Sequence, residues 1–574
     1  MHRPKTPSMR ADAAGALRAY AAGALRHDLL AAAIVAVLLI PQSLAYALLA
    51  GLPPQVGLYA SLLPLVAYAA LGSSPLLGIG PVAVLALMIS QALAQAPATV
   101  DASHAALVLA AEVGLLLATA AVLRLDALAS LLSVPVLRGF ETGAALSIAL
   151  SQLPVLLGAS AQGSNLPQVF GSWWQAQTRW SPLTALYGIT AWLALWLTRR
   201  HAAGWLARHM SAASATLLAR LAPLAVLVLA IVAATLGDAG AHGVRLVGAL
   251  PDLAPAIGLP PLDATLWWRM LPSALLIALV AFVSSLVVAE SLARRDGARI
   301  EPRRELAGLA AANLAAALSA GMPVAGSFTR SVLNLDAGAR TRMAGVFTAA
   351  LMGLALLLLG RPLAALPAAV LAATIVVAVL PVLDWRPFRE AWRYSRSEGV
   401  LMSAVAALTV LQGVTWALGV GVAASIALLL QRTARPHVAL IGRVAGTEHY
   451  RNVDRHEVQL TAGVMALRID ESLLFTNARA LADVVQQQLA HYRESHPDTR
   501  RLVLLMSPVN RIDFSGLEAL RALHTMLAAH GIRLDLSEVK GPVLDALRAG
   551  GWTEWFTGQV FLSHHQAMLD RGIE

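Results

Sequence analysis

The chain has 574 residues, of which 57% are hydrophobic and 13% are charged, and it contains no cysteine. Soluble globular proteins carry about 25% charged residues, so roughly half of the usual charge is missing. This composition excludes a wholly soluble protein, because so much apolar sequence would leave large exposed apolar patches, and it excludes a disordered chain. The lack of cysteine excludes disulfide frameworks, zinc–cysteine sites, iron–sulfur clusters and cysteine nucleophiles.

The formal net charge of +10 is divided unevenly along the chain. Met1–Arg443 carries a net charge of +13, whereas Val444–Glu574 carries −3. A high isoelectric point often indicates nucleic-acid binding, but the arginines here lie between apolar segments and not along one face. Membrane topology accounts for the basic excess better than a phosphate-binding surface does, and no nucleic-acid partner is expected.

Residues 1–28 form a basic, alanine-rich tail that lacks the short apolar core of a cleavable signal peptide. Residues 29–433 hold about fourteen segments of the kind that cross a membrane as helices. The clear ones are Leu29–Ala50, Val56–Leu71, Ala105–Leu123, Leu183–Leu197, Ala213–Leu236, Leu271–Leu292, Leu306–Ala320, Met343–Leu359, Leu363–Leu383, Val400–Gln412 and Trp416–Leu430. Three further segments are interrupted by proline, glycine or polar residues, namely Val82–Leu93, Leu128–Leu150 and Ser327–Leu335. The prediction is an α-helical, polytopic membrane protein.

Arginine clusters predict the orientation, because cytoplasmic loops carry an excess of basic residues. The clusters lie in the N-terminal tail and around 199–208, 294–304, 340–342 and 386–396. Two long connections, 151–181 and 237–270, have few basic residues. Fourteen spans with a cytoplasmic N-terminus place every cluster on the cytoplasmic side and both sparse connections outside. We therefore expect a multi-pass protein of the inner (cytoplasmic) membrane, in contact with lipid, with both termini in the cytoplasm.

Two segments broken by glycine and proline, Ser73–Val84 and Gly321–Ser331, each form the third element of a seven-span half. In transporters with inverted repeats, such a pair indicates half-helices whose N-termini face the substrate near mid-membrane. Facing N-termini suit an anion, because they offer unpaired N–H groups and positive partial charge. Arg330 is either an anion contact or a member of a structural ion pair. Alternatively, the glycines and prolines are ordinary packing and kink residues.

Residues Leu39–Ser61, LIPQSLAYALLAGLPPQVGLYAS, closely resemble the first-span signature of the sulfate permease (SulP) family, also called solute carrier family 26. Further matching residues are Gly72–Ser74, Gly80–Ala83, Arg304–Leu306, Asn313 and Gly326–Ser331. The resemblance covers nearly the whole chain. It implies two inverted seven-span repeats divided into core and gate domains, a homodimer, and elevator-type transport of small inorganic or carboxylate anions.

The resemblance also implies where the anion binds, namely between the two half-helix N-termini with residues of the first span nearby. The implied substrate-binding residues are Gln42, Tyr46, Pro81, Val82, Ala83, Phe328, Thr329 and Arg330. No metal or cofactor is expected, apart from coupling to protons or sodium, which the sequence leaves open.

Ion coupling is where the sequence departs from the family. Counting back from Glu305, Ser284 stands where the family usually has a carboxylate that is implicated in proton or sodium coupling in ion-coupled relatives. A serine does not titrate, which argues against simple proton symport through this position. Glu290, close to Arg294 and Arg295, is either an interfacial ion-pair partner or a displaced coupling residue.

Two further carboxylates lie inside predicted spans. Glu141 is three residues from Arg138, so an intrahelical pair is expected. Glu112 has no obvious partner in the sequence, which makes it a third coupling candidate.

The last part of the chain is predicted to be a soluble α/β domain, 450–574, after a linker, 434–449. The expected strands are Met465–Ile469, Arg501–Met506 and Ile532–Leu536, and the expected helices are Asn477–His491 and Phe514–His530. Asn477 is a plausible N-cap and Gly531 a helix stop. Strand–helix alternation predicts a small sheet with helices packed on it.

Val509–Leu520 resembles the signature of the STAS domain (sulfate transporter and anti-sigma-factor antagonist). The family commonly shows Asp-Ser-Ser-Gly where this chain has Asp513-Phe514-Ser515-Gly516. Ser515 is either a regulatory phosphorylation site or a plain helix-start residue. A cytoplasmic partner of this domain is a further expectation. No Walker-type loop is present, so ATP-driven transport is not expected.

No metalloprotease spacing or nucleophile elbow occurs in the sequence, so an enzyme is not expected. We predict a secondary active transporter or exchanger of a small anion, such as sulfate, bicarbonate, chloride or a dicarboxylate. Two alternatives are a nucleobase permease of the same architecture and a membrane sensor that signals through the STAS domain. Arg330 and the STAS unit argue against the nucleobase permease, a class that usually places carboxylates at the base. The sequence leaves open which anion is carried and whether by symport, exchange or channel-like flow.

Overall fold

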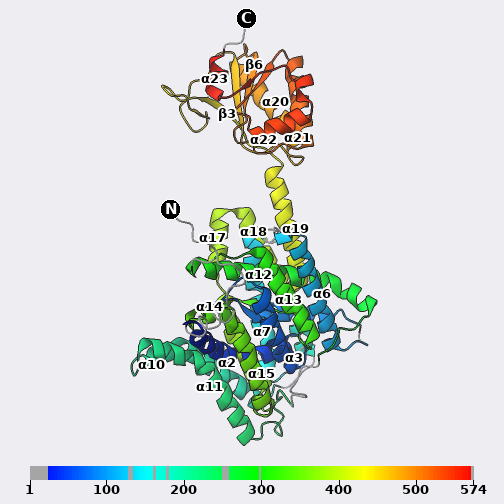
Figure 1. Cartoon of the computed structure of the whole chain (residues 1–574), viewed down its shortest axis with the longest axis vertical. Helices are drawn as coiled ribbons and strands as arrows, with labels where there is room; N and C mark the ends of the chain where they lie inside the picture. Colours follow the sequence, from blue (N-terminus) through cyan, green and yellow to red (C-terminus); the bar gives the residue numbers. More distant parts are fainter. Residues whose placement is uncertain are drawn as a thin grey trace, which may run out of the picture. The chain divides into compact units, whose positions relative to one another are not determined.

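The computed structural model describes residues 23–97, 99–126, 133–159, 163, 165–175, 180–248, 257–296 and 299–570. By its internal contacts the chain forms two compact units, Met1–Ser425 and Ile426–Glu574. The first is a helical bundle and the second an α/β fold (Figure 1). Most of the basic tail expected at 1–28 lies outside the described residues, since the description begins at residue 23.

The first seven membrane-crossing segments of the helical unit appear in the predicted order. They are α2 (Leu25–Leu49), α3 (Pro54–Tyr59) with α4 (Leu63–Leu71), β1 (Gly78–Gly80) with α5 (Ala83–Leu93), α6 (Ala102–Val122), α7 (Val134–Leu156), α9 (Pro182–Leu197) and α11 (Ala212–Leu236). Shorter connecting helices are α8 (Leu166–Gln175), the π-helix η2 (Thr198–Ala202) and α10 (Ala203–Leu206).

The second seven segments repeat this order of elements, including a short strand that leads into a short helix at the third place. They are α12 (Ala264–Asp296), α13 (Pro302–Leu318), β2 (Ala325–Ser327) with α14 (Phe328–Asp336), α15 (Met343–Ala364), α16 (Ala368–Val379), α18 (Arg396–Leu411) and α19 (Val414–Thr433). The 3₁₀ turn η3 (Leu380–Val382) and helix α17 (Arg386–Tyr394) connect α16 to α18.

The two half-helices are much shorter than the longest spans of the helical unit. Seven helical segments of the described chain are long and apolar enough to cross a membrane on their own. In contrast, α5 has 11 residues and α14 has 9. At 1.5 Å per residue, such helices reach about 15 Å, roughly half of a 30 Å hydrocarbon core. Both are therefore half-helices, as the sequence predicted.

Helix α7 differs from the predicted span Leu128–Leu150 by six residues at each end. The helix begins at Val134, and Pro135 stands in its first turn. A proline is well tolerated there, because the backbone N–H that it lacks has no partner in the first turn. Residues 127–132 lie outside the described part of the chain.

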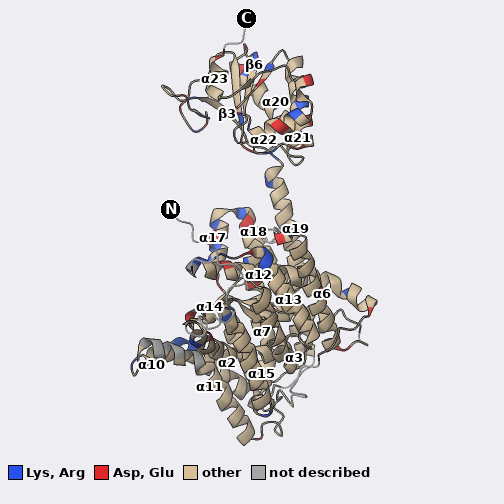
Figure 2. Cartoon of the chain, in the orientation of Figure 1, with Lys and Arg blue, Asp and Glu red and all other residues tan. Residues whose placement is uncertain are grey.

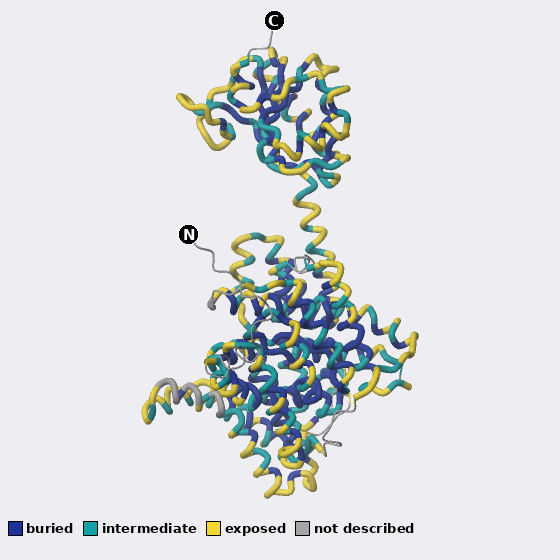
Figure 3. The backbone as a smooth tube through the Cα atoms, in the orientation of Figure 1, coloured by how far each residue is buried: buried dark blue, intermediate teal, exposed yellow. Residues whose placement is uncertain are grey.

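Burial and charge in the helical unit follow the pattern of a membrane protein. Buried residues fill the interior of the bundle (Figure 3), and most of the bundle carries no charged residues (Figure 2). Large apolar side chains are nevertheless exposed on its outer helices, for example Leu186, Leu229, Leu358 and Trp416. Lipid contact explains this exposure, which water would penalise.

Small residues allow the helices of this unit to approach closely, as is common in membrane bundles. A Cβ atom added to Gly114 of α6 would lie 2.7 Å from Cγ of Leu314 on α13. A Cβ atom added to Gly57 of α3 would lie 1.9 Å from the carbonyl oxygen of Ser43 on α2. Both contacts exclude a larger residue without backbone movement.

The C-terminal unit contains a six-stranded sheet in the order β4-β3-β5-β6-β7-β8. Its strands are β3 (Val438–Arg443), β4 (Tyr450–Asn452), β5 (Val464–Ile469), β6 (Arg501–Leu505), β7 (Arg533–Ser537) and β8 (Val560–Phe561). Strands β5 to β8 are parallel, whereas β3 is antiparallel to both β4 and β5. The helices are α20 (Ala478–Ser495), α21 (Phe514–Ala529), α22 (Gly541–Ala549) and α23 (His564–Leu569), with the 3₁₀ turn η4 (Trp552–Glu554).

Two details of this unit correct the expectations from the sequence. The expected linker, 434–449, contains strand β3, so the folded sheet begins before residue 450. Asn477 precedes α20 but makes no capping hydrogen bond to it. Its Oδ1 instead accepts from the backbone N–H of Leu474, and its Nδ2 donates to the carbonyl of Ser472, so the side chain closes the loop before the helix.

Candidate functional site: two half-helices joined by a short ribbon

The two broken segments meet in a short antiparallel ribbon formed by β1 and β2. Gly78 pairs with Ser327, Ile79 with Gly326 and Gly80 with Ala325. Each strand leads into its half-helix, α5 from Ala83 and α14 from Phe328. Because the strands are antiparallel, the half-helices leave the ribbon in opposite directions. Their starting points, Ala83 and Phe328, therefore lie beyond opposite ends of the ribbon.

Neither half-helix has a side-chain cap at its N-terminus. The N-cap residues are Val82 for α5 and Ser327 for α14, and neither side chain bonds the start of its helix. The first backbone N–H groups of an α-helix have no partner within the helix, and the helix dipole places positive partial charge there. Both starts are therefore suited to hold a negatively charged ligand.

Arg330, in the first turn of α14, reaches across the ribbon to the start of α5. Its Nη1 donates to the carbonyl oxygen of Pro81 at 2.7 Å, and its Nε donates to that of Gly78 at 3.5 Å. The residue is only 2% exposed. Its Nη2 is buried and has no hydrogen-bond partner among the described residues. Leaving a buried charged donor unpaired is costly, so this atom indicates a place for an acceptor.

The two glycines of β1 make room for the Arg330 side chain. A Cβ atom on Gly78 would lie 2.8 Å from Cβ of Arg330, and one on Gly80 would lie 3.4 Å from Nη2. Gly80 also has a φ of +147°, a conformation that other residues rarely adopt. These contacts give a physical reason for glycine at both positions.

Buried hydroxyl groups tie the ribbon to the helices on either side. Ser331 Oγ of α14 accepts from the N–H of Gly78 at 2.9 Å and donates to the carbonyl of Ser327 at 2.6 Å. Ser285 Oγ of α12 accepts from the N–H of Gly326 at 2.8 Å. The ribbon therefore depends on side chains from α12 and α14 as well as on its own backbone bonds.

Asparagine side chains hold the chain just outside the ribbon. Asn313 of α13 accepts from the N–H of Val324 at 2.9 Å and donates to its carbonyl at 3.1 Å. Asn334 of α14 donates to the carbonyl of Leu76 at 3.2 Å. Together with the serines, these bonds join both half-helices to α12 and α13.

A buried carboxylate anchors the segment that leads into β1. Glu305 of α13 is fully buried, and it accepts hydrogen bonds from the Tyr68 hydroxyl at 2.8 Å and from the N–H of Ser74 at 2.8 Å. The N–H and hydroxyl of Ser73 donate to it as well, at 3.2 and 2.5 Å. Several donors on one carboxylate make a strong, specific anchor.

The first span contributes Gln42 and Tyr46, one helical turn apart on α2. This helix packs against both half-helices. Tyr46 is only 7% exposed, and Gln42 is half-buried. Next to them, the hydroxyls of Ser43 and Ser61 are hydrogen-bonded at 2.8 Å. The first span thus lies beside both half-helices, and the roles of Gln42 and Tyr46 in substrate binding stay predictions.

The remaining predicted site residues lie at the two helix starts with differing accessibility. Pro81 is buried, and Val82 and Ala83 are half-buried. Phe328 is 55% exposed and Thr329 is exposed. The first turn of α14 is therefore accessible on one side, with Arg330 beneath it. Whether these residues bind substrate stays a prediction.

The three coupling candidates have different surroundings. Ser284 of α12 is half-buried and its hydroxyl donates to the carbonyl of Val280 at 2.6 Å, a bond within its own helix. Glu290 is exposed near the end of α12, and its expected pairing remains a prediction because the Arg295 side chain lies outside the described residues. Glu112 of α6 is 4% exposed, and its Oε2 is buried without a partner in the described chain.

Two expectations about ion pairs can be compared with the structure. Arg138 and Glu141 form the predicted intrahelical pair at 3.4 Å. Arg330 has no carboxylate partner among the described residues, which leaves its role in a structural ion pair without support.

The sequence did not predict the structural roles of Ser285 and Ser331, although Ser331 lies within the matching residues Gly326–Ser331 and Ser285 stands next to Ser284. Their importance depends on hydrogen bonds to residues 41 and 253 positions away, which no local pattern reveals. Glu305 and Asn313 did carry a signal, since both belong to the residues that resemble the sulfate permease family.

In the C-terminal unit, Ser515 is exposed in the first turn of α21. Asp513 caps this helix, because its Oδ1 accepts from the N–H of Gly516 at 2.8 Å. The other oxygen, Oδ2, accepts from the N–H of Phe475 at 2.7 Å. The expected place of Ser515 at a helix start is confirmed, and its regulatory role stays a prediction.

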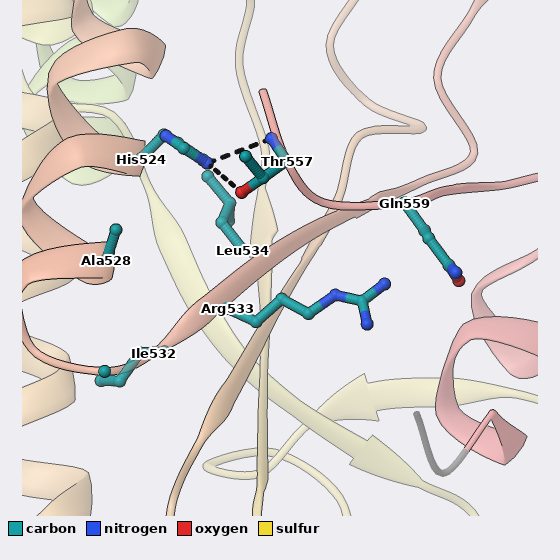
Figure 4. Close-up of a pocket in the computed structure, with 8 residues that line it drawn as sticks. His524, Ala528, Ile532, Arg533, Leu534, Thr557 and Gln559 are labelled. Atoms are coloured by element: carbon teal, nitrogen blue, oxygen red, sulfur yellow. Dashed lines mark hydrogen bonds between the residues drawn. The ribbon is translucent and has the colours of Figure 1, made fainter. Parts of the chain in front are cut away.

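A surface hollow of about 500 Å³ lies in the same unit beside α21 and β7 (Figure 4). His524 Nε2 lies 3.0 Å from Oγ1 of Thr557 and accepts from its backbone N–H at 3.3 Å, and burial lowers the pKa of this histidine. Arg533 Nε donates to Asp535 at 3.0 Å. The main polar groups of the hollow are thus bonded to neighbours, unlike Nη2 of Arg330.

Comparison with known proteins assigns both units. The model of the sulfate permease family matches residues 25–405, and that of the STAS domain matches residues 455–567. The chain is 34% identical over 532 residues to "Probable sulfate transporter MT1781" of Mycobacterium tuberculosis, covering 92% of this chain and 91% of the relative. It is 32% identical over 554 residues to "Probable sulfate transporter 4.2" of Arabidopsis thaliana, covering 93% and 80%.

Solved structures with a similar fold cover either the whole chain or the helical unit alone. The murine solute carrier 26 family member A9 anion transporter, in its inward-facing state, matches with a TM-score of 0.85 at 21% identity, covering 99% of this chain and 96% of that one. The transmembrane domain of the cyanobacterium bicarbonate transporter BicA matches with a TM-score of 0.58 at 23% identity, covering 70% and 97%. At these identities the likeness establishes the fold, two inverted repeats of seven spans followed by a STAS domain.

Proposed function

This chain belongs to the sulfate permease family, and on that premise we propose that it carries a small anion through the space between the starts of α5 and α14. Membership makes it a multi-span anion transporter and not an enzyme. The observation that carries the proposed site is Nη2 of Arg330, which is buried and unpaired within the described chain. A bound anion would supply the missing acceptor.

Sulfate is the anion that we propose first. Relatives at 32% and 34% identity are named as sulfate transporters. A tetrahedral dianion has enough acceptor oxygens to receive bonds from two helix starts and one guanidinium at once. Bicarbonate, chloride and dicarboxylates offer fewer or more widely spaced acceptors at a single point. They are the competitors that a flux assay must include.

An elevator-type motion agrees with the way the site is built. Ser285, Asn313 and Ser331 bond the ribbon to its surroundings, and Glu305 fixes the segment ahead of β1. The two half-helices, α12 and α13 therefore form one connected body. We propose that this body carries the anion across the membrane as a unit, because moving one half-helix alone would break several buried hydrogen bonds.

Glu112 is the residue that we propose for proton coupling. A carboxyl group buried in a membrane bundle without a basic partner is costly when ionised, so it binds a proton unless another charge compensates. Ser284 does not titrate, and Glu290 is exposed. If Glu112 does not couple, sodium symport, exchange of one anion for another and channel-like flow remain.

The test of the transport site is sulfate uptake by the purified full chain in liposomes. Saturable uptake is expected, with competition by unlabelled sulfate and no uptake of uracil. Arg330→Ala is expected to abolish or strongly weaken uptake, while the control Arg138→Ala, which breaks a surface ion pair, is expected to leave it unchanged. No saturable flux of any anion in the panel would overturn the proposal.

We also propose that the protein is a homodimer in the inner membrane with both termini in the cytoplasm, as the arginine clusters and the family resemblance imply. The cysteine-free chain allows a direct topology test. Ala241→Cys, in an exposed turn after α11, is expected to react with an impermeant maleimide from outside intact cells. Ser515→Cys is expected to react only after permeabilisation. The reverse pattern would invert the orientation.

Ser515 is proposed as a regulatory phosphorylation site within the STAS domain, where a cytoplasmic partner would act. Its exposure and its place in the first turn of α21 support this, because phosphate is favourable at a helix N-terminus. Mass spectrometry of the protein from its native membrane is expected to detect phosphoserine in the peptide. A fully unmodified peptide under all growth conditions would leave Ser515 as a helix-start residue.

A further inference from the structure

Helix α17 and its flanking residues carry charge and aromatic side chains that the transport site does not use. We propose that Trp385–Arg396 forms a binding surface for the anionic headgroups of membrane phospholipids. The proposal concerns residues outside the half-helices, and its binding test does not depend on which anion is transported.

The sequence of α17 divides into an apolar and a basic face. At 100° per residue around the helix axis, Trp385, Phe388 and Trp392 fall within an arc of about 60°. Arg386, Arg389 and Arg393 fall within a second arc of about 60°, which begins about 40° from the first. A helix with an aromatic face bordered by arginines is typical of segments that lie in the membrane interface.

The connectivity places α17 at the membrane surface. It follows α16 through the turn η3 and precedes α18, and these two helices correspond to the spans Leu363–Leu383 and Val400–Gln412 predicted from the sequence. A nine-residue helix between two such segments lies where both of them end. Headgroups of the surrounding lipid are therefore at the same level as α17.

The Trp392 ring fixes α17 against α18, while other side chains of α17 and its flanking residues remain exposed. The Trp392 ring packs on α18, since a Cβ atom added to Gly399 would lie 2.7 Å from it. Its Nε1 donates to Ser403 Oγ at 3.2 Å. The rings of Trp385 and Phe388 contact each other with centroids 5.5 Å apart. Even so, Trp385 is 61% exposed and Tyr394 is 85% exposed.

Charge complementarity favours an anionic lipid as the occupant. Arg386, Arg389, Arg393 and Arg396 are all exposed. Asp384 offsets part of this charge, through a contact of 3.9 Å with Arg386, and Glu390 offsets another part. Guanidinium groups bind phosphate in a bidentate manner, and exposed tryptophan and tyrosine rings settle at the headgroup level. A zwitterionic bilayer can contact the aromatic face, but it offers no net negative charge to the arginines.

The test uses the full chain in vesicles of phosphatidylcholine with and without phosphatidylglycerol. The triple variant Arg386→Gln, Arg389→Gln, Arg393→Gln is compared with a control triple in the STAS domain, Arg479→Gln, Arg521→Gln, Arg548→Gln. Native mass spectrometry counts the phosphatidylglycerol molecules retained. Quenching by brominated phosphatidylglycerol, compared between the wild type and Trp385→Phe, reports contact of that ring with lipid.

Retention of phosphatidylglycerol is expected to fall several-fold in the α17 triple and to stay unchanged in the control. The corresponding arginine-to-lysine triple is expected to restore it, which separates charge from folding. Equal retention by both triples would overturn the proposal, as would equal retention of both lipid types by the wild type. Shielding of Trp385 from brominated lipid by a protein contact would assign the surface to a protein partner instead.

Discussion

Arg330 Nη1 donates a hydrogen bond of 2.7 Å to the carbonyl oxygen of Pro81, so a cation from the second repeat is held at the helix start of the first. The two residues are separated by 249 positions in the sequence. The bond uses one side of the guanidinium and leaves Nη2 without an acceptor in the described chain. The guanidinium group therefore lies next to the N-termini of both half-helices.

Substituting Arg330 is expected to weaken anion binding without unfolding the protein. Arg330→Ala removes a charged hydrogen bond, worth about 1.5–3 kcal/mol, which corresponds to an increase of roughly tenfold to a hundredfold in the KM for uptake. Arg330→Lys keeps the charge but loses the forked arrangement of N–H donors, so its KM is expected to lie between those of the wild type and Arg330→Ala. Unchanged KM in both variants would return Arg330 to a structural role.

Gly78→Ala is expected to disturb the same site without touching a charge. The new Cβ atom would lie 2.8 Å from Cβ of Arg330, and overpacking of this kind costs about 1–3 kcal/mol. Uptake is expected to fall about tenfold or more, because small displacements at a binding site have large effects on rate. Gly419→Ala in α19, where nothing lies within 4 Å, is the matched control and is expected to keep wild-type uptake.

Glu112→Gln is expected to remove stimulation of uptake by an inward proton gradient. The amide has nearly the shape of the protonated carboxyl but carries no exchangeable charge, so the variant should transport at a rate insensitive to the gradient. Uptake is measured at fixed internal pH with varied external pH. Glu141→Gln, which breaks the pair with Arg138, serves as control. A gradient response equal to the wild type would remove Glu112 from coupling.

Ser284→Glu is expected to introduce a new dependence on pH or sodium. The position lies next to Ser285, whose hydroxyl holds the ribbon at Gly326, so an added carboxyl group would stand close to the transport site. Comparing uptake across pH and sodium series in the variant and the wild type measures the change. Identical profiles would mean that position 284 does not set coupling here.

His564 predicts a pH dependence of STAS-domain stability. Burial lowers its pKa from 6.5 to about 4, and its Nδ1 lies 2.8 Å from the Ser537 hydroxyl. Because the unfolded chain binds the proton more readily, stability is complete above about pH 6.5 and declines as the pH falls towards 4. The full loss is about 3 kcal/mol.

Hydrogen exchange of the β6 and β7 amides in the solubilised chain measures this decline. In a plot of the free energy of unfolding against pH, His564→Gln is expected to flatten the slope between pH 4 and 6.5. The curves of variant and wild type are expected to run parallel at other pH values, which serves as the internal reference. Parallel slopes in variant and wild type would assign the acid sensitivity to other groups.

The fold was largely predictable because its signals are local. The length of apolar segments predicts the spans, and arginine clusters predict the cytoplasmic loops. Glycine and proline residues predict that Ser73–Val84 and Gly321–Ser331 are interrupted helices. Strand β3 was missed because its partner β5 follows only after an intervening segment that includes β4, so no short hairpin pattern marks the pairing. Asn477 was misread for a related reason, since its side chain prefers backbone partners in the preceding loop to the helix.

The candidate site was predictable only in outline. Arg330 stood out as a charge inside an apolar stretch, and the resemblance supplied Tyr46. The hydrogen bonds of Ser331 to Gly78 and of Ser285 to Gly326 join segments far apart in the sequence. A serine on a membrane helix is common, so its role becomes visible only when the partner is placed beside it.

The β1–β2 ribbon makes each repeat incomplete without the other. Gly78, Ile79 and Gly80 have their strand partners only in the second half, and the guanidinium that covers the start of α5 comes from there too. If the chain were cut after α11, neither fragment alone could form the ribbon, and function would require reassembly of both. The effects of substitutions at Gly78 and Arg330 are consequently coupled across the two halves, because a side chain at position 78 would meet that of Arg330.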